Sequence, residues 1–361
     1  SGSLDVSGGV LNISDELDVS NGTVKQTGGI INIVSYTGSG QGSSSDKFEI
    51  DAGTLELTGG ELNILGQASS TYYAMQIASG VTVTPNANHK TVFNCSDEDM
   101  YMDLNGKTLG KLTIAHGSTY SVFAKGNFTL LGKLAINGGG KLESYSNAGN
   151  ITLNGGDFVN NGTFDLNSSN ITFTGSGDVN CGAITSNAGG SVTINKTSSS
   201  NTVTTTGNLD LNYFTVSAGT FDVATSTLTV GGATDINGTL EIGTGEYNAD
   251  GTFDATGGNV TFTGDGSLKL SSTVTSLGSL TTTAGTVEYD GGTQNVLADT
   301  YYNLQTDQSG VKTALGNITV NGDFTVGSAS TFAAGTYNTD IIGNADLDGT
   351  ITSTSGFFTT N

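Results

Sequence analysis

The sequence predicts an all-β chain folded as a right-handed parallel β-helix of about 16–18 coils, with roughly 20–22 residues in each coil. Three observations predict this fold: short runs in which apolar and polar residues alternate, 55 glycines against 1 proline, and internal repeats. Only 12% of residues are charged, and Val, Ile, Leu, Phe and Thr recur throughout. Disordered chains have the opposite composition. We expect almost no helix, because no stretch keeps an apolar helical period over several turns.

Residues 1–85 contain a short repeat and should form N-terminal coils. The copies "SGSLDVSGGVLNI", "NGTVKQTGGIINI" and "AGTLELTGGELNI" begin at Ser1, Asn21 and Ala52. Apolar residues alternate within each copy, as at Leu55 and Leu57, which indicates short strands joined by glycine turns. In a β-helix each strand pairs with the equivalent strand one coil on, about 4.8 Å away. Each step from one copy to the next therefore corresponds to one coil, with a polar insertion in the second and longer step.

The segment 86–107 breaks this pattern and is predicted to be an irregular acidic joint. Its run "DEDMYMD" gathers four carboxylates within seven residues. Calcium binds to oxygen ligands at this sort of density, so the segment is the candidate metal site. The candidate ligands are Asp97, Glu98, Asp99 and Asp103. The run lacks the spacing of a known calcium loop, however, and a solvated acidic loop with no cofactor is the alternative.

Residues 108–361 carry a repeat with a longer period. "NGTFDLNSSNITFTGSG", "AGTFDVATSTLTVGG" and "DGTFDATGGNVTFTGDG" begin at Asn161, Ala218 and Asp250. We interpret the steps from the first copy to the second and to the third as nearly three and about four coils. A third motif recurs as "GNFTL", "GNLDL" and "GNITV". Glycine should supply the corner conformations, and stacked Asn and Thr side chains should satisfy backbone amides in the turns.

Charge and cysteine content limit the possible partners. The chain has 33 acidic residues against 11 lysines and carries a net charge of −22, so nucleic acid is a poor partner. No run of about 18 apolar residues is present, so we expect no membrane insertion. Cys95 and Cys181 are separated by about four coils, which is too far for a disulfide. We expect both to be unpaired and mostly buried.

A family resemblance comes from the stretches "GTVEYDGGTQNVLA" and "TYYNLQTDQSGVKTALGNITVNGDFTV". The residues that carry it are Gly291, Gly292, Gln294, Tyr302, Asn303, Leu304, Gly316, Asn317, Ile318, Asn321 and Gly322. This pattern resembles the repeats of very large secreted surface proteins of the Bacteroidetes, including gliding-motility adhesins exported by the type IX system. The resemblance covers about residues 108–361, and the shorter repeat spacing at the N-terminus departs from it.

The resemblance implies a structural, non-catalytic adhesin or stalk on the bacterial cell surface, but no site residues. Ser1 lies inside the first repeat, so flanking repeats of a larger parent chain are the expected partners. Surface glycans and other cell-surface proteins are further candidates.

Two other functions stay open. β-Helices also occur in polysaccharide lyases and hydrolases, whose sites combine carboxylates with Arg, Lys or His. This chain has no arginine, and its two histidines, His89 and His116, lie in irregular or turn-like contexts, so we expect no enzyme. An enzyme would instead show a groove where three carboxylates and a lysine converge. A glycan-binding module would show a row of exposed tyrosines on one face, and the candidates are Tyr72, Tyr73, Tyr301 and Tyr302.

Overall fold

The computed structural model describes residues 2–34, 47–65, 73–94, 99–115, 120–145, 149–185 and 190–360. All regular elements in these residues are β-strands, and the parallel sheets stack as a β-solenoid of about 15 turns. The predicted all-β parallel β-helix is confirmed, with slightly fewer turns than expected. The described residues contain no helix that is long and apolar enough to cross a membrane. Contacts divide the chain into two compact units, Ser1–Ser191 (unit 1) and Val192–Asn361 (unit 2).

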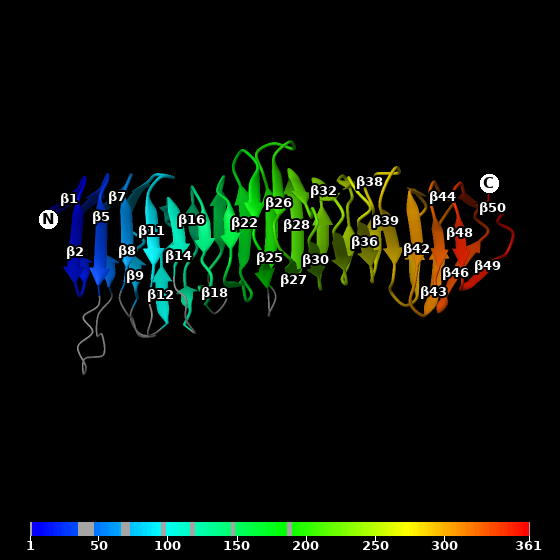
Figure 1. Cartoon of the computed structure of the whole chain (residues 1–361), viewed down its shortest axis with the longest axis horizontal. Helices are drawn as coiled ribbons and strands as arrows, with labels where there is room; N and C mark the ends of the chain where they lie inside the picture. The colour runs from blue at the N-terminus through cyan, green and yellow to red at the C-terminus, as the bar shows by residue number, and fades with distance from the viewer. Residues whose placement is uncertain are drawn as a thin grey trace. The chain divides into compact units, whose positions relative to one another are not determined.

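In unit 1 each strand except β10 pairs in parallel with the strand three places further along the chain, so that each coil contributes to three sheets (Figure 1). One sheet contains β1 (Gly2–Val6), β4 (Gly22–Gln26), β7 (Gly53–Leu57) and β10 (Thr82–Pro85). The second contains β2 (Val10–Ser14), β5 (Ile30–Val34), β8 (Glu61–Ile64), β11 (Lys90–Phe93), β14 (Lys111–Ile114), β17 (Leu134–Ile136), β20 (Phe158–Asn160) and β23 (Val179–Cys181). The third contains β3 (Leu17–Val19), β6 (Phe48–Ile50), β9 (Met75–Ile77), β12 (Met100–Asp103), β15 (Val122–Ala124), β18 (Lys141–Ser144), β21 (Thr163–Asp165) and β24 (Ile184–Thr185). From the fifth coil a further sheet contains β13 (Thr108–Leu109), β16 (Phe128–Leu130), β19 (Ile151–Asn154) and β22 (Asn170–Thr174).

Unit 2 follows the same rule, and β25 (Ser191–Asn195) contains the boundary between the units. One sheet contains β26 (Thr202–Thr205), β29 (Thr220–Asp222), β32 (Thr239–Ile242), β35 (Asn259–Phe262) and β38 (Ser279–Leu280). The second contains β27 (Leu209–Leu211), β30 (Thr227–Val230), β33 (Glu246–Ala249), β36 (Ser267–Leu270), β39 (Thr286–Tyr289), β42 (Asn303–Thr306), β45 (Phe324–Val326) and β48 (Ala345–Leu347). The third contains β28 (Tyr213–Ala218), β31 (Thr234–Ile236), β34 (Phe253–Asp254) and β37 (Val274–Ser276). The last coils form two further sheets with β40 (Gln294–Val296), β43 (Gly310–Ala314), β46 (Ser330–Gly335) and β49 (Thr350–Ser353), and with β41 (Thr300–Tyr301), β44 (Ile318–Val320), β47 (Thr339–Ile341) and β50 (Phe358–Thr360).

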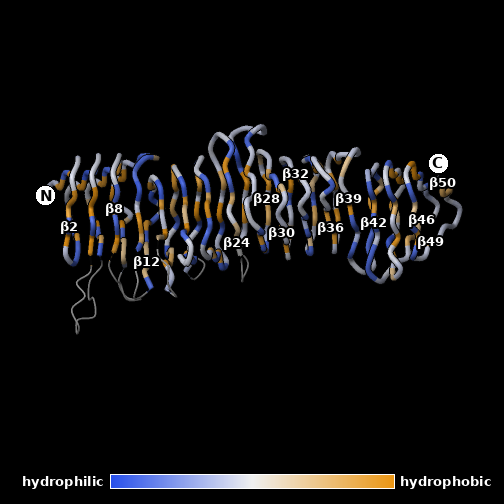
Figure 2. Tube along the Cα trace, in the orientation of Figure 1, coloured by the Kyte–Doolittle hydropathy of each residue, from blue (hydrophilic) through white to orange (hydrophobic). Residues whose placement is uncertain are grey.

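The core consists of columns of apolar side chains that point inward from successive coils. One column in unit 1 contains Ile33, Ile64, Phe93, Ile114 and Ile136. One column in unit 2 contains Leu209, Leu228, Tyr247, Leu268, Val287, Leu304 and Phe324. All of these side chains are buried. Burial stabilises the fold by about 1.5–3 kcal/mol for each large apolar side chain, and Figure 2 shows the alternation along the strands that produces it.

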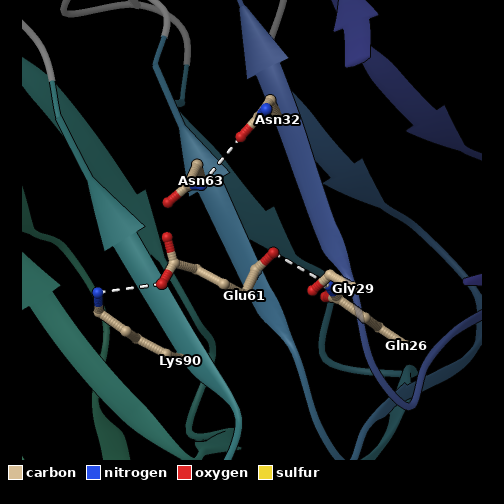
Figure 3. A network of polar contacts seen from close by, with 6 residues as sticks. All are labelled: Gln26, Gly29, Asn32, Glu61, Asn63 and Lys90. Carbon is tan, nitrogen blue, oxygen red and sulfur yellow. Dashed lines mark hydrogen bonds and ion pairs between the residues drawn. The ribbon is translucent and has the colours of Figure 1, made fainter. Parts of the chain in front are cut away.

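The short N-terminal repeat corresponds to successive coils, as predicted. Gly2 pairs with Gly22, and Gly22 pairs with Gly53. On the outer face of the next sheet, the amide of Asn32 donates to Asn12 at 2.8 Å. The amide of Asn63 donates to Asn32 at 2.9 Å in the same way (Figure 3). The repeat therefore places identical residues in columns where they contact one another.

The predicted joint at 86–107 is not a break in strand pairing within the described residues. The strand β11 pairs with β8 on one side and β14 on the other, and β12 pairs in the same way with β9 and β15. Its segments "KTVF" and "MYMD" bury Phe93, Met100 and Met102, so they supply core residues as the other coils do. The boundary between the two compact units lies at Ser191 and Val192.

The long-period repeat specifies a strand and its corner. In all three copies the aspartate of "TFD" accepts the amide N–H two residues on, at 2.9 Å for Asp165, 2.7 Å for Asp222 and 2.9 Å for Asp254. Within unit 2, the strands β29 and β34 that carry two of these copies belong to different sheets. The copies are thus not stacked on one another, because the steps between them are not whole numbers of coils.

The Gly-Asn motif joins neighbouring coils. The side-chain oxygen of Asn127 accepts the backbone N–H of Asn150 at 3.0 Å. Asn208 accepts the N–H of Thr227, and Asn317 that of Asn338, at the same distance. Asparagine side chains thus accept backbone N–H groups of the next coil, as predicted. Each of these "GN" motifs therefore has a role in coil stacking.

A buried polar network lies inside unit 1 (Figure 3). The amide nitrogen of Gln26 donates to the carbonyl oxygen of Glu61 at 2.9 Å and to that of Gly29 at 3.3 Å. Its oxygen lies 3.0 Å from Nε2 of His89, and both side chains are fully buried. The other ring nitrogen of His89, Nδ1, has no hydrogen-bond partner among the residues that the structure describes. Burial lowers the pKa of His89 from 6.5 to about 4, against the opposing effect of the Glu61 carboxylate.

This network predicts a loss of stability in acid. Between pH 6.5 and about 4 the unfolded chain protonates His89 while the folded chain does not, so stability should fall as the pH falls through this window. The shift corresponds to about 3 kcal/mol at its lower end. Melting temperatures measured between about pH 7 and pH 4 should therefore fall less in His89→Gln than in the unchanged protein. The two proteins have the same carboxylates, so any difference in the pH dependence of their melting temperatures comes from His89. Parallel curves of melting temperature against pH would therefore contradict the role assigned to His89.

The close approach of coils at Gly53 predicts intolerance of any side chain there. Gly53 has a φ of +107°, and an added Cβ would collide with the carbonyl oxygen of Gly22. We expect Gly53→Ala to cost at least about 2 kcal/mol and to lower the melting temperature of unit 1 by about 4–8 °C. Gly80→Ala is the matched control, since nothing lies within 4 Å of its added Cβ. Equal melting temperatures for the two variants would show that this contact does not limit stacking.

Candidate functional site

The most distinctive outward-facing group is an aromatic cluster on the third sheet of unit 1. Tyr101 on β12 and Phe123 on β15 are register partners, between inward-facing residues such as Met102 and Ala124. Lys125 and Tyr145 directly follow β15 and β18. We call Tyr73, Tyr101, Phe123, Lys125 and Tyr145 the tyrosine–lysine cluster. The same alternation that builds the core therefore places these rings side by side on the outer surface.

The rings pack closely and surround a cation. Tyr101 and Phe123 stack with centroids 5.1 Å apart, and Tyr145 meets both edge-on at 5.6 and 5.9 Å. The Nζ atom of Lys125 lies 4.5, 4.7 and 4.9 Å from the ring centroids of Tyr101, Tyr73 and Tyr145. Cation–π contacts at this range contribute about 0.5–1 kcal/mol each at exposed sites. Within the described residues, Lys125 makes no ion pair.

A polar rim adjoins the rings. The backbone N–H of Ser121 donates to Asp99 at 2.8 Å, and its hydroxyl donates to Glu143 at 2.5 Å. Lys141 forms an ion pair with Glu143 at 3.1 Å. Burial raises the pKa of Tyr101, and the nearby Asp99, Tyr145 and Glu143 raise it further. The Tyr101 hydroxyl therefore stays neutral at physiological pH and keeps a proton to donate.

Of the four tyrosines predicted to contact glycans, three lie in the described residues. Tyr73 belongs to the tyrosine–lysine cluster, whereas Tyr72 lies outside the described residues. Tyr301 is fully buried, with its hydroxyl donating to the carbonyl of Leu297 at 2.8 Å. The prediction that Tyr301 contacts a glycan at the surface was therefore wrong, because the alternation along β41 turns this side chain inward. Tyr302, the next residue, is half-buried.

Of the four predicted metal ligands, two lie in the described residues. Asp97 and Glu98 lie outside them, and Asp99 binds the backbone of Ser121. Asp103 accepts the N–H of Asn105 at 3.0 Å, which is the corner contact made by the aspartates of the "TFD" repeats. The described residues contain no group of three or more His, Cys, Asp or Glu side chains placed to hold a metal ion.

A charged ladder in unit 2 is the arrangement nearest to a catalytic one. Lys269 pairs with Glu246 at 2.7 Å and is the register partner of Glu288. The hydrogen bond that Lys269 donates to Glu246 raises the pKa of Lys269, so this side chain stays protonated and cannot act as a general base. Burial pushes the pKa of Glu246 upward, but hydrogen bonds from Lys269 and Asn248 outweigh it and lower the pKa. Burial raises the pKa of Glu288. The pKa values of Glu246 and Glu288 are thus shifted in opposite directions, and Lys269 pairs with Glu246, whose pKa is lowered.

The two cysteines are only partly described. Cys181 is buried at the end of β23, and burial raises its pKa well above the usual range, so the thiol is unreactive. The burial expected of Cys181 is confirmed. Cys95 lies outside the described residues.

Sequence reasoning missed most of the tyrosine–lysine cluster. Tyr101 and Phe123 occur in unrelated words, "DMYMD" and "SVFAK", which belong to successive coils. An alignment of successive coils would have placed the two rings side by side, because their spacing equals one coil. The run "DEDMYMD" is conspicuous for its carboxylates, and nothing within it indicates that its tyrosine faces other rings.

Comparisons with known proteins do not identify a family or a function for this chain. No protein-family model matches the chain, and neither curated proteins nor solved structures show a match. The resemblance to Bacteroidetes surface proteins therefore stays a prediction.

The arrangement of the acidic residues predicts little response to chelation. Because Asp99 and Asp103 already accept backbone N–H groups, we expect a chelator to change the melting temperature by less than about 2 °C. A tightly bound ion would instead add about 3 kcal/mol at 100-fold excess over its dissociation constant. Thermal melting with and without chelator measures the difference. A drop of more than about 5 °C, abolished in the double variant Asp97→Asn, Glu98→Gln, would establish a metal site in this segment.

Proposed function

We propose that this chain is a structural and adhesive, non-catalytic segment of a secreted protein on the bacterial cell surface. One observation carries the proposal: its recurring motifs serve coil stacking. The "GN" asparagines accept amides of the next coil, and the "TFD" aspartates cap corners. A chain whose repeated residues are devoted to scaffolding is suited to holding other parts of a protein in place. Export by the type IX system and a part in gliding motility would follow from the resemblance.

Exposed apolar side chains support flanking repeats as the partners. Leu11 and Ile13 are half-buried, whereas their register partners Ile31 and Ile33 in the next coil are buried. Leu347 is 42% exposed, and its partner Val326 is fully buried. These side chains belong to inward columns, so further coils stacked on β2 and β48 would cover them.

A carbohydrate-active β-helix enzyme is the second candidate function. The split in pKa between Glu246 and Glu288 favours it, because glycosidases use one ionised and one protonated carboxyl group. The ion pair between Glu246 and Lys269 disfavours it, because it occupies the carboxylate that would act on the substrate.

Surface display tests the proposed function directly. Antibodies raised against the purified chain should label intact cells of the source organism, and brief protease treatment of those cells should remove the label. Cells from which the gene is deleted should attach to a solid surface several-fold less well, because the adhesive segment is lost. Attachment is measured by counting cells retained under flow.

A cytosolic protein provides the control for that experiment, since its antibodies should label only permeabilised cells. If antibodies against this chain also require permeabilisation, the proposed location and the adhesive role are both wrong.

A further inference from the structure

The tyrosine–lysine cluster combines exposed ring surface with hydrogen-bonding groups. Tyr145 is 39% exposed, whereas Tyr101 beneath it is only 7% exposed. The carboxylates of Asp99 and Glu143 lie close enough to Tyr101 to influence its titration. Sites with an apolar floor and a few polar groups at the edge bind ligands that have both an apolar face and polar edges. Sugar rings have this character, since their C–H faces are apolar and their hydroxyls project at the edge.

The lysine in the cluster argues against a cationic ligand. Aromatic cages bind ammonium groups through the negative faces of their rings. Here the Nζ atom of Lys125 already lies over three rings of the cluster, those of Tyr73, Tyr101 and Tyr145. A second cation would have to displace this ammonium or sit beside it, and like charges a few ångströms apart repel.

The overall charge argues against an anionic ligand. Lys125 and Lys141 offset the charges of Asp99 and Glu143 at the cluster, but the whole chain carries a net charge of −22. An acidic polysaccharide would meet repulsion from this long-range field. Charge complementarity therefore leaves a neutral ligand. The same two carboxylates keep lone pairs beyond those that Ser121 and Lys141 use, and these can accept the hydroxyl groups of such a ligand.

We propose that the tyrosine–lysine cluster is the adhesive contact of this segment and that it binds a neutral glycan. A sugar ring packs its C–H face on Tyr145, and its hydroxyls donate to Glu143 and Asp99. Lys125 holds the tyrosine rings together from the other side and fixes their spacing. The strands β12, β15 and β18 span about 10 Å, which suits a short stretch of polysaccharide rather than a single sugar. This inference rests on the proposed adhesive function and names its ligand class.

Affinity electrophoresis of the full chain in gels that contain polysaccharide tests the proposal. The neutral probes are dextran, laminarin and xyloglucan, and the anionic probes are alginate and polygalacturonate. We expect at least one neutral probe to retard the chain and both anionic probes to leave its mobility unchanged. Tyr145→Ala should weaken the retardation by about tenfold, as removal of a central aromatic contact does.

Tyr213→Ala is the matched control, because Tyr213 is an exposed tyrosine of unit 2 and is 49% exposed. Three results would overturn the proposal: no retardation by any neutral probe, equal retardation by an anionic probe, or full retardation of Tyr145→Ala. Release of reducing sugar from a neutral probe would instead support the enzyme. The assay uses purified protein, so its failure leaves the result of surface labelling intact.

A fluorescent reporter makes the contact visible without relying on loss of binding. The chain has no tryptophan, so Tyr145→Trp introduces a single one at the proposed contact. The retarding probe should change its emission in a saturable way, while Tyr213→Trp should not respond. An unresponsive Tyr145→Trp chain that is still retarded would place the glycan elsewhere on the molecule.

Discussion

In-register parallel pairing of successive coils is the constraint on which the rest of this structure depends. It brings equivalent residues of neighbouring coils to within about 4.8 Å of one another. Each column must therefore consist of side chains that can pack against, or hydrogen-bond to, similar side chains. Apolar columns such as the one through Ile33 and Ile64 satisfy this requirement by burial. Asparagine columns satisfy it by hydrogen bonding, as Asn32 and Asn63 do. Where backbones approach most closely, as at Gly53, only glycine fits.

The same constraint organises the outer surface. Side chains alternate along a strand, so the register that aligns Met100 with Val122 in the core also aligns Tyr101 with Phe123 outside. The Cα atoms that carry these rings cannot separate without breaking the pairing of β12 with β15. A binding surface built in this way is held in place before the ligand arrives, which reduces the conformational entropy lost on binding. The solenoid therefore supplies the rigidity that a shallow aromatic surface needs.

The sequence was sufficient to predict the fold but not the site. Alternation with a period of two and recurring glycines predict stacked strands, because both follow from the backbone geometry of each coil alone. A site on the outer face depends on register between coils, and coil length varies. The register partners Asn32 and Asn63 belong to a long coil that contains a polar insertion, whereas Thr286 and Asn303 are partners across a much shorter one. Tyr301 shows a second limit of prediction from sequence. Its strand β41 has only two residues, so the sequence pattern does not show which of them points inward, and Tyr301 is the buried one.

Repeated and unrepeated residues divide the tasks of this chain. The letters that recur, in "GN" and "TFD", bind the next coil or cap a corner, and the structure explains them without any ligand. Tyr101, Phe123 and Tyr145 belong to neither motif, yet three successive strands bring them together at one place. Stacking alone does not require aromatic residues on an outer face, because Thr113 occupies an outward position of a neighbouring strand without difficulty. Residues that the scaffold does not require are where a function separate from stacking should be sought.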